Sequence, residues 1–308
     1  MKIAVISPLF ARSPELMGEL GKHFDDIKHN ADNTIKTKAD MIAFLQGVDG
    51  AVVGREVIDE EILRACPTLK ILSRYGVGLD NLDLEAMTRQ GVALGWSGGT
   101  NSNSVAEITL SLMLSLIRNL HIATTLLKQH IWKVNGGSEL TGKTIGLFGF
   151  GHIAKRVVEL LAPFHCRILV ANRTQNSEDA LKYGITYASK EEILREADII
   201  SIHLPLTQES KNLFSTKEFE AMKPTAFIIN TARGGIVDEE ALKVALKTGQ
   251  IAGAGLEAFV VEPPQDWELI DLPNLVCLPH LGGNSKESIL AMGYACITHL
   301  KEFFLPQA

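Results

Sequence analysis

Short apolar runs alternate with longer segments of helical period along most of the chain, and this alternation is typical of parallel βαβ units. In the first third, the runs that predict buried strands are Lys2–Ser7, Ala51–Val53, Lys70–Ser73 and Val92–Leu94. A second series comprises Thr144–Phe148, Arg167–Ala171, Asp198–His203, Ala226–Asn230, Ile251–Leu256 and Leu275–Leu278. The pattern predicts an α/β protein with two Rossmann-like, doubly wound parallel-sheet domains.

A cluster of structure-breaking residues, Ser97–Asn101, separates the two series and supplies N-cap candidates for the long helix that follows. A dinucleotide-binding fold normally starts at its glycine loop, yet more than 90 residues of α/β pattern precede that loop here. The first segment therefore belongs to another domain, which the apolar, periodic segment Glu287–Phe304 could return to complete. We predict a discontinuous domain from residues 1–98 and 283–308 and an inserted dinucleotide-binding domain from residues 99–282.

Composition narrows the classes of partner. The 308 residues include 30 Lys and Arg against 36 Asp and Glu, and the formal charge of −6 argues against a nucleic acid partner. Cys66, Cys166, Cys277 and Cys296 lie far apart without zinc-site spacing, so we expect reduced thiols, no metal and a cytoplasmic location. The most apolar helical stretch, around residues 105–120, contains two charged residues, so we expect no membrane span.

The first strand of the second series runs directly into a glycine loop and then a helix-like segment. Gly149 allows a tight turn, Gly151 lets the backbone approach a pyrophosphate, and Ala154 is small enough for close helix–strand packing. We therefore predict that Gly149, Gly151, His152 and Ile153 contact a dinucleotide, with the His152 side chain facing solvent. The alternative is a tight βα turn with no ligand.

The second strand of this series should end in an acid that binds the adenosine ribose of NAD(H). It ends instead in Asn172, Arg173 and Thr174. A carboxylate repels a 2′-phosphate, whereas a guanidinium and a hydroxyl can donate hydrogen bonds to it. The sequence therefore favours NADP(H) over NAD(H), although NAD(H) stays possible if Arg173 is an ordinary solvated residue.

Polar residues follow three later strands, at the sheet edge where open α/β folds bind their ligands. Arg233 follows one strand, Glu257 and Glu262 follow the next, and His280 follows the last. Each alone could be a surface or capping residue. Together, downstream of a dinucleotide loop, they supply a carboxylate anchor, an orienting acid and a proton carrier.

At this point the sequence resembles the D-isomer-specific 2-hydroxyacid dehydrogenases, in the branch of phosphoglycerate dehydrogenase and glyoxylate/hydroxypyruvate reductase. The resemblance extends over nearly the whole chain and rests on the order and spacing of its motifs. The motifs are Arg74–Asn81, Ser104–Glu107, Gly142–Thr144 with the glycine loop, His203–Thr207, Asn230–Gly234, Glu262-Pro263 and Pro279-His280.

The resemblance implies a homodimeric NAD(P)-dependent enzyme with an active site between a substrate domain and a cofactor domain. Arg233 would bind the substrate carboxylate and polarise its carbonyl, His280 would be the general acid/base, and Glu262 would orient His280. The loop Gly76–Gly78, with Val77 at its centre and Arg74 beside it, would bind the carboxylate of a small 2-oxo or 2-hydroxy acid.

The resemblance also assigns residues to the cofactor. Glu257 stands where the family commonly has Asp, and its longer side chain could still accept a hydrogen bond from the nicotinamide amide. The other implied cofactor contacts are His203, Pro205, Thr231, Ala232 and Gly283.

The sequence identifies the substrate less clearly than it identifies the family. Arg74, Arg55 and Arg12 would suit a phosphorylated substrate, but the NADP(H) expectation favours hydroxypyruvate or glyoxylate. D-3-phosphoglycerate dehydrogenase is the alternative, and a nucleotide-sensing scaffold of the C-terminal-binding-protein type is a distant one. Because the chain ends at Ala308, we expect no serine-sensing regulatory domain.

Overall fold

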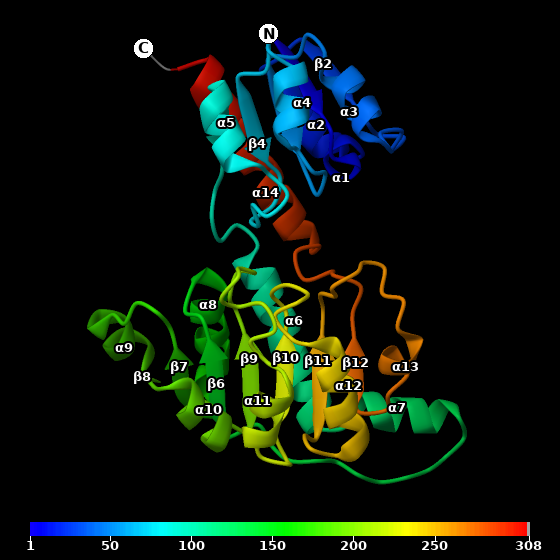
Figure 1. Ribbon diagram of the computed structural model, residues 1–308, viewed down its shortest axis with the longest axis vertical. Coiled ribbons are helices and arrows are strands. Elements are labelled where there is room, and N and C mark those ends of the chain that lie inside the picture. Colours follow the sequence, from blue (N-terminus) through cyan, green and yellow to red (C-terminus); the bar gives the residue numbers. More distant parts are fainter. Residues whose placement is uncertain (307–308) are drawn as a thin grey trace. The chain divides into compact units, whose positions relative to one another are not determined.

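The computed structural model of the protein describes residues 1–306 and divides the chain into two compact units. The first unit comprises Met1–Asn101 and Gly283–Ala308, and the second comprises Ser102–Gly282 (Figure 1). The sequence placed these boundaries after residues 98 and 282. Residues 307–308 of the predicted C-terminal segment lie outside the described residues.

The first unit contains a five-stranded parallel sheet in the order β2-β1-β3-β4-β5. Its strands are β1 (Lys2–Val5), β2 (Asp26–His29), β3 (Gly50–Val53), β4 (Ile71–Arg74) and β5 (Ala93–Gly95). Its helices are α1 (Pro8–Ala11), α2 (Pro14–Gly21), α3 (Lys38–Leu45), α4 (Glu60–Ala65), α5 (Leu84–Gln90) and α14 (Lys286–Phe304). Helices α3–α5 supply the apolar cluster on one face, and α1, α2 and the returning α14 supply the cluster on the other.

The second unit contains a seven-stranded parallel sheet in the order β12-β11-β10-β9-β6-β7-β8. Its strands are β6 (Thr144–Phe148), β7 (Arg167–Ala171), β8 (Ile185–Tyr187), β9 (Ile199–Ile202), β10 (Phe227–Asn230), β11 (Gly253–Leu256) and β12 (Leu275–Cys277). Its helices are α6 (Ser102–Ile117), α7 (Leu120–Lys128), α8 (His152–Leu161), η1 (Ala162–Phe164), α9 (Ser177–Tyr183), α10 (Lys190–Glu196), α11 (Thr216–Ala221), α12 (Glu239–Thr248) and α13 (Trp267–Ile270).

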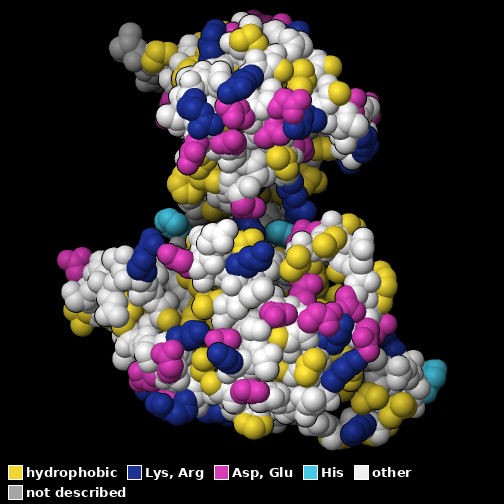
Figure 2. All heavy atoms as spheres, in the orientation of Figure 1, with side chains coloured by type: hydrophobic (Ala, Val, Ile, Leu, Met, Phe, Trp, Pro, Cys, Tyr) yellow, Lys and Arg dark blue, Asp and Glu magenta, His cyan; other side chains and the backbone are white. Residues whose placement is uncertain are grey.

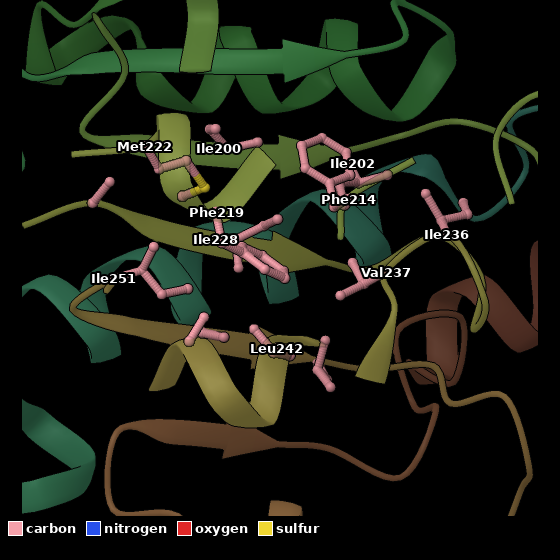
Figure 3. Packing of buried hydrophobic residues seen from close by; sticks show 14 of the residues in the cluster. Ile200, Ile202, Phe214, Phe219, Met222, Ile228, Ile236, Val237, Leu242 and Ile251 are labelled. Carbon is pink, nitrogen blue, oxygen red and sulfur yellow. The ribbon is translucent and has the colours of Figure 1, made fainter. Parts of the chain in front are cut away.

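Helices cover both faces of this second sheet. Apolar side chains of α6 and α8 pack on one face, and those of α10, α11 and α12 pack on the other. Figure 3 shows the second of these clusters, in which Phe214 and Phe219 lie beside Ile202 and Ile228 of the sheet. The strand order reverses between β6 and β9, and such a switch point is where doubly wound sheets bind their ligands.

The sequence pattern missed β2 and β8, which each form an edge of their sheet. No residue of β2 is buried, and Ile185 is the one buried residue of β8. Edge strands need no continuous apolar run because they pair on one side only. Their main-chain pairing to β1 and β7 is therefore invisible in a hydrophobicity pattern.

Helix α7 differs from the other long helices because none of its residues is buried. Among residues 1–306, no single helix is long and apolar enough to cross a membrane, although α6 and α7 together pass that test as a pair bent by 66°. Half of α6 is buried in the core, so burial within the unit accounts for its apolar character.

The contact between β6 and α10 generates a stability prediction. A Cβ at Gly146 would lie 2.2 Å from Cγ2 of Ile193 and 3.2 Å from Cβ of Ala197. We expect Gly146→Ala to lower the free energy of unfolding of this unit by about 1–3 kcal/mol through overpacking. Chemical denaturation followed by circular dichroism measures this change.

Ile193→Ala provides the control for this contact. Alone it removes buried methyl groups and should destabilise the unit by about 2–5 kcal/mol. In combination it makes room for the new Cβ, so Gly146→Ala/Ile193→Ala should lose less stability than the two single changes added together. Strict additivity would contradict the packing described.

Candidate active site

The glycine loop lies between β6 and α8 and is shaped by a close approach of two backbones. Gly149 has φ +91°, and a Cβ there would lie 2.6 Å from the carbonyl oxygen of His203. Gly151 is exposed, and a Cβ there would meet nothing within 4 Å. Gly151 is also the N-cap of α8 and supplies no side-chain hydrogen bond to it. The first N–H groups of α8 are thus available to a pyrophosphate, and the loop fits a dinucleotide.

The end of β7 presents the residues predicted to select the cofactor. Arg173 and Thr174 are exposed, while Asn172 is half-buried and donates from Nδ2 to the Thr174 carbonyl oxygen at 2.6 Å. This hydrogen bond shapes the turn with a neutral side chain where an NAD(H)-binding strand would end in a carboxylate.

His203, at the end of β9, lies against the glycine loop. Its Nε2 is 3.0 Å from the hydroxyl of Ser201, and its backbone N–H donates to Phe148 at 2.8 Å. Burial lowers the pKa of His203 to about 4. The ring is therefore neutral near pH 7, which suits a wall of the cofactor site better than a proton donor.

His280 and Glu262 form a close pair. Nδ1 of His280 lies 2.8 Å and 2.9 Å from the two carboxylate oxygens of Glu262. Both side chains stay about one-third exposed, at 30% and 34%, so they are accessible to a small molecule. Glu262 is itself held, because its Oε1 accepts a hydrogen bond from the backbone N–H of Phe259 at 3.2 Å.

Arg233 follows β10 in a turn that Asn230 stabilises. The Asn230 side chain accepts from the N–H of Ala232 at 3.1 Å and donates to the carbonyl oxygen of Arg233 at 2.8 Å. A Cβ at Gly234 would lie 2.0 Å from the carbonyl carbon of Phe259. The turn that carries Arg233 is therefore packed directly against the loop that leads to Glu262.

Glu257 lies buried at the end of β11, against the backbone that follows His280. Its side chain is 2% exposed, and its carboxylate accepts hydrogen bonds from the backbone N–H groups of Leu281 and Gly282. Burial raises the pKa of Glu257, and these two N–H donors oppose that rise. The protein's own backbone thus occupies this carboxylate, and a hydrogen bond to a nicotinamide amide stays a prediction.

The guanidinium of Arg74 is likewise bonded to the protein's own backbone. It is buried at the end of β4, and its guanidinium donates to the carbonyl oxygens of Gly54, Tyr75 and Gly78. These contacts tie the loop Gly76–Gly78 to the loop after β3. The side chain therefore supports a backbone loop of the first unit, and its contact with a substrate stays a prediction.

The second unit brings most predicted site residues to the carboxyl edge of its sheet. Gly76–Gly78, Arg74 and Gly283 belong to the first unit, and their roles toward a ligand stay predictions. Figure 2 shows basic and acidic side chains intermingled on the visible face of both units. Within the described residues, no group of His, Cys, Asp or Glu could hold a metal ion. The remaining predicted contacts are His152 and Pro205, both exposed, Ile153 and Ala232, both half-buried, and Thr231, which is buried.

Sequence reasoning named Ser104 within a motif but assigned no contact to it, and it missed Thr109, although both α6 residues support this edge. Ser104 donates to the carbonyl oxygen of Gly282 at 2.5 Å, and the hydroxyls of Thr109 and Thr231 lie 3.0 Å apart. Both α6 residues are buried. The available signal was a hydroxyl at a core position of an otherwise apolar helix, because such a group needs a partner.

Comparison with known proteins agrees with this geometry. Residues 110–282 match the family described as "D-isomer specific 2-hydroxyacid dehydrogenase, NAD binding domain". The chain is 37% identical over 240 residues to a glyoxylate reductase from Thermococcus litoralis, covering 75% of this chain and 72% of that protein. It is 39% identical over 251 residues to a D-3-phosphoglycerate dehydrogenase from Mycobacterium tuberculosis, covering 80% of this chain but 48% of that protein.

The chain thus spans about half the length of the phosphoglycerate dehydrogenases that it matches. Among solved structures, a glyoxylate reductase from Paecilomyes thermophila has a TM-score of 0.86 at 25% identity, covering 98% of this chain and 94% of that one. The family match covers more than half of the chain. The chain therefore belongs to the D-isomer specific 2-hydroxyacid dehydrogenases, a family of oxidoreductases that act on CH–OH groups with a nicotinamide cofactor.

Proposed function

We propose that this protein is an NADP(H)-preferring reductase of a small, unphosphorylated 2-oxo acid, with hydroxypyruvate or glyoxylate as substrate. The observation that carries the proposal is the contact between Nδ1 of His280 and the carboxylate of Glu262, at the sheet edge that also bears Arg233. A carboxylate only accepts hydrogen bonds, so Nδ1 must carry a proton in this pair. Nε2 is then the nitrogen that exchanges a proton with the substrate.

The reaction needs a proton at the same time as a hydride. A bound nicotinamide cofactor supplies the hydride to the keto carbon of the substrate. Protonated His280 gives the proton on Nε2 to the forming alkoxide oxygen, and the negative charge of Glu262 stabilises the imidazolium until that transfer. In the oxidative direction, neutral His280 removes the hydroxyl proton.

Arg233 supplies the fixed positive charge of the proposed site. Its planar guanidinium can bind a 2-oxo carboxylate through two parallel hydrogen bonds, which a lysine cannot do. One of its N–H groups, on Nη1, donates to the carbonyl oxygen of Ala232 at 2.8 Å and so orients the side chain. We assign Arg233 to binding the substrate carboxylate and polarising the adjacent carbonyl.

The contacts of Arg74 support an unphosphorylated substrate. Its guanidinium is buried and donates to three backbone carbonyl oxygens, so a substrate phosphate would compete with bonds that shape the loop. The similarity to two archaeal proteins named glyoxylate reductase points the same way. Similarity to phosphoglycerate dehydrogenases keeps 3-phosphoglycerate as the alternative substrate.

We also propose that two copies of the chain associate through α7 and the segment that follows it. This region exposes Leu127 (57%), Trp132 (83%) and Val134 (85%), and no residue of α7 is fully buried. A contiguous exposed apolar surface usually marks an interface. Closed twofold pairs are the commonest assemblies of identical chains.

The first test compares cofactors and substrates directly. We expect initial rates to be higher with NADPH than with NADH, and higher with hydroxypyruvate or glyoxylate than with phosphohydroxypyruvate. Arg173→Ala should raise the KM for NADPH about tenfold, because one charged hydrogen-bond donor is lost. Asn172→Asp should shift the preference toward NADH by repelling the 2′-phosphate.

Arg195→Ala is the matched control, since Arg195 is an exposed arginine of the same unit that pairs with Glu196. It should leave both KM values unchanged. A preference for NADH together with turnover of only the phosphorylated substrate would instead identify a phosphoglycerate dehydrogenase.

The second test addresses the proton donor. His280→Asn should lower kcat by about 100-fold or more, and Glu262→Gln by about tenfold to 100-fold, while the Kd for NADPH stays within error. His165→Asn is the control, because His165 is exposed and has φ +52°, the same value as His280. If kcat of His280→Asn matched that of the control, His280 would not be the acid/base.

The third test concerns the assembly. Light scattering after size-exclusion chromatography should give about twice the chain mass of 33.6 kDa for the wild type. Leu127→Asp/Trp132→Asp should be monomeric because two charges would be buried in the interface. Leu181→Asp, which alters a leucine 88% exposed on α9, should remain a dimer. A monomeric wild type would refute this part of the proposal.

A further inference from the structure

We infer that Glu257 is a positioning residue for His280, acting through the backbone that follows the histidine. The inference rests on the proposed role of His280 as the acid/base. It assigns to Glu257 a part in catalysis that is separate from binding the cofactor.

The contacts of Glu257 run from β11 to the segment after β12. Its backbone N–H donates to the carbonyl oxygen of Asn230 at 3.0 Å, which places Glu257 in line with the end of β10. Its carboxylate accepts from the N–H of Leu281, and from the N–H of Gly282 at 3.0 Å and 2.9 Å. These are the two peptide groups that immediately follow His280.

Gly282 is held from both sides. Its one N–H donates to both carboxylate oxygens of Glu257, and its carbonyl oxygen accepts from the Ser104 hydroxyl at 2.5 Å. On the other side of the histidine, the N–H of His280 donates to the carbonyl oxygen of Leu278 at 3.0 Å. His280 thus sits between two fixed points of the backbone.

The conformation of His280 explains why this restraint matters. Its φ of +52° lies in the left-handed region, which a residue with a Cβ adopts at some cost in energy. Such a conformation persists only where the surroundings impose it. The hydrogen bonds from Leu281 and Gly282 to Glu257 impose it here, and they thereby keep Nδ1 against Glu262.

The Glu257 side chain is long enough to reach the space that is open because Gly282 has no side chain. A Cβ at Gly282 would lie 2.5 Å from Oε2 of Glu257, whereas the nearest atom of another residue outside its chain neighbours, Cγ2 of Val105, would be 3.5 Å away. The carboxylate of Glu257 therefore fills the space that a Cβ would take. An aspartate, one methylene shorter, would draw its carboxylate away from both N–H groups.

Variants of Glu257 separate positioning from cofactor binding. Glu257→Asp keeps the charge, and an aspartate is what the family commonly carries there, but it withdraws the carboxylate. We expect kcat to fall about 100-fold, because a displacement of about 1 Å at a reacting group has that effect. The KM and Kd for NADPH should stay within about threefold of the wild type.

Glu257→Gln is the shape-matched comparison. Its amide oxygen can still accept from Leu281 and Gly282, and one hydrogen bond to Gly282 is lost, so kcat should fall by about tenfold at most. If Glu257 served mainly to bind the nicotinamide amide, Glu257→Asp would retain kcat and the Kd for NADPH would rise with Glu257→Gln. That result would overturn the inference.

Gly282→Ala tests the same contact from the other side. Alone, it should lower kcat about as much as Glu257→Asp, because the new Cβ displaces the carboxylate. In the Glu257→Asp background the space is already vacant, so the second change should add no further loss. Fully additive losses in the double variant would show that the two residues act independently.

Hydrogen exchange distinguishes failure of this inference from failure of the proposed function. Mass spectrometry of peptides that contain Leu281 and Gly282 should show faster exchange in Glu257→Asp than in the wild type, whatever the substrate is. Faster exchange with unchanged kcat would refute the positioning role alone. A wild type inactive on every 2-oxo acid tested, with the exchange difference present, would refute the proposed function but not the contact.

Discussion

The parallel arrangement of the seven-stranded sheet is the constraint on which the site depends. Because all its strands run the same way, the residues that follow β6, β9, β10, β11 and β12 meet at one edge. Strands β9 and β11 are buried along their whole length, and β6 and β10 are buried at every residue but the first. Residues distant in sequence, such as Arg233 and His280, therefore reach one region without any long connection that would have to be ordered separately.

The turns at that edge are held together by close approaches of backbone to backbone. Gly149 packs against the carbonyl oxygen of His203, and Gly234 packs against the peptide of Phe259. In both cases a side chain would occupy the place of a main-chain atom. The glycines therefore set the spacing between neighbouring loops, and polar side chains such as Asn230 then fix the orientation within each loop.

Much of this arrangement could be predicted from the sequence, because the central strands are continuous apolar runs and the glycine loop has a characteristic spacing. The edge strands β2 and β8 could not, since they pair through backbone groups and bury little. The partners of Glu257 and Arg74 could not be predicted either. Both charged side chains are buried and bind backbone N–H or carbonyl groups, which every residue has, so residue types give no signal of such pairing.

The two histidines at strand ends show how environment divides the roles of one residue type. Desolvation lowers the pKa of His203 to about 4, so its ring is neutral near pH 7. His280 is partly exposed, and its Nδ1 lies 2.8 Å from a carboxylate oxygen of Glu262. A strand-end position in the sequence does not distinguish them. The structure distinguishes them by their surroundings, because only His280 has a carboxylate, that of Glu262, against its Nδ1.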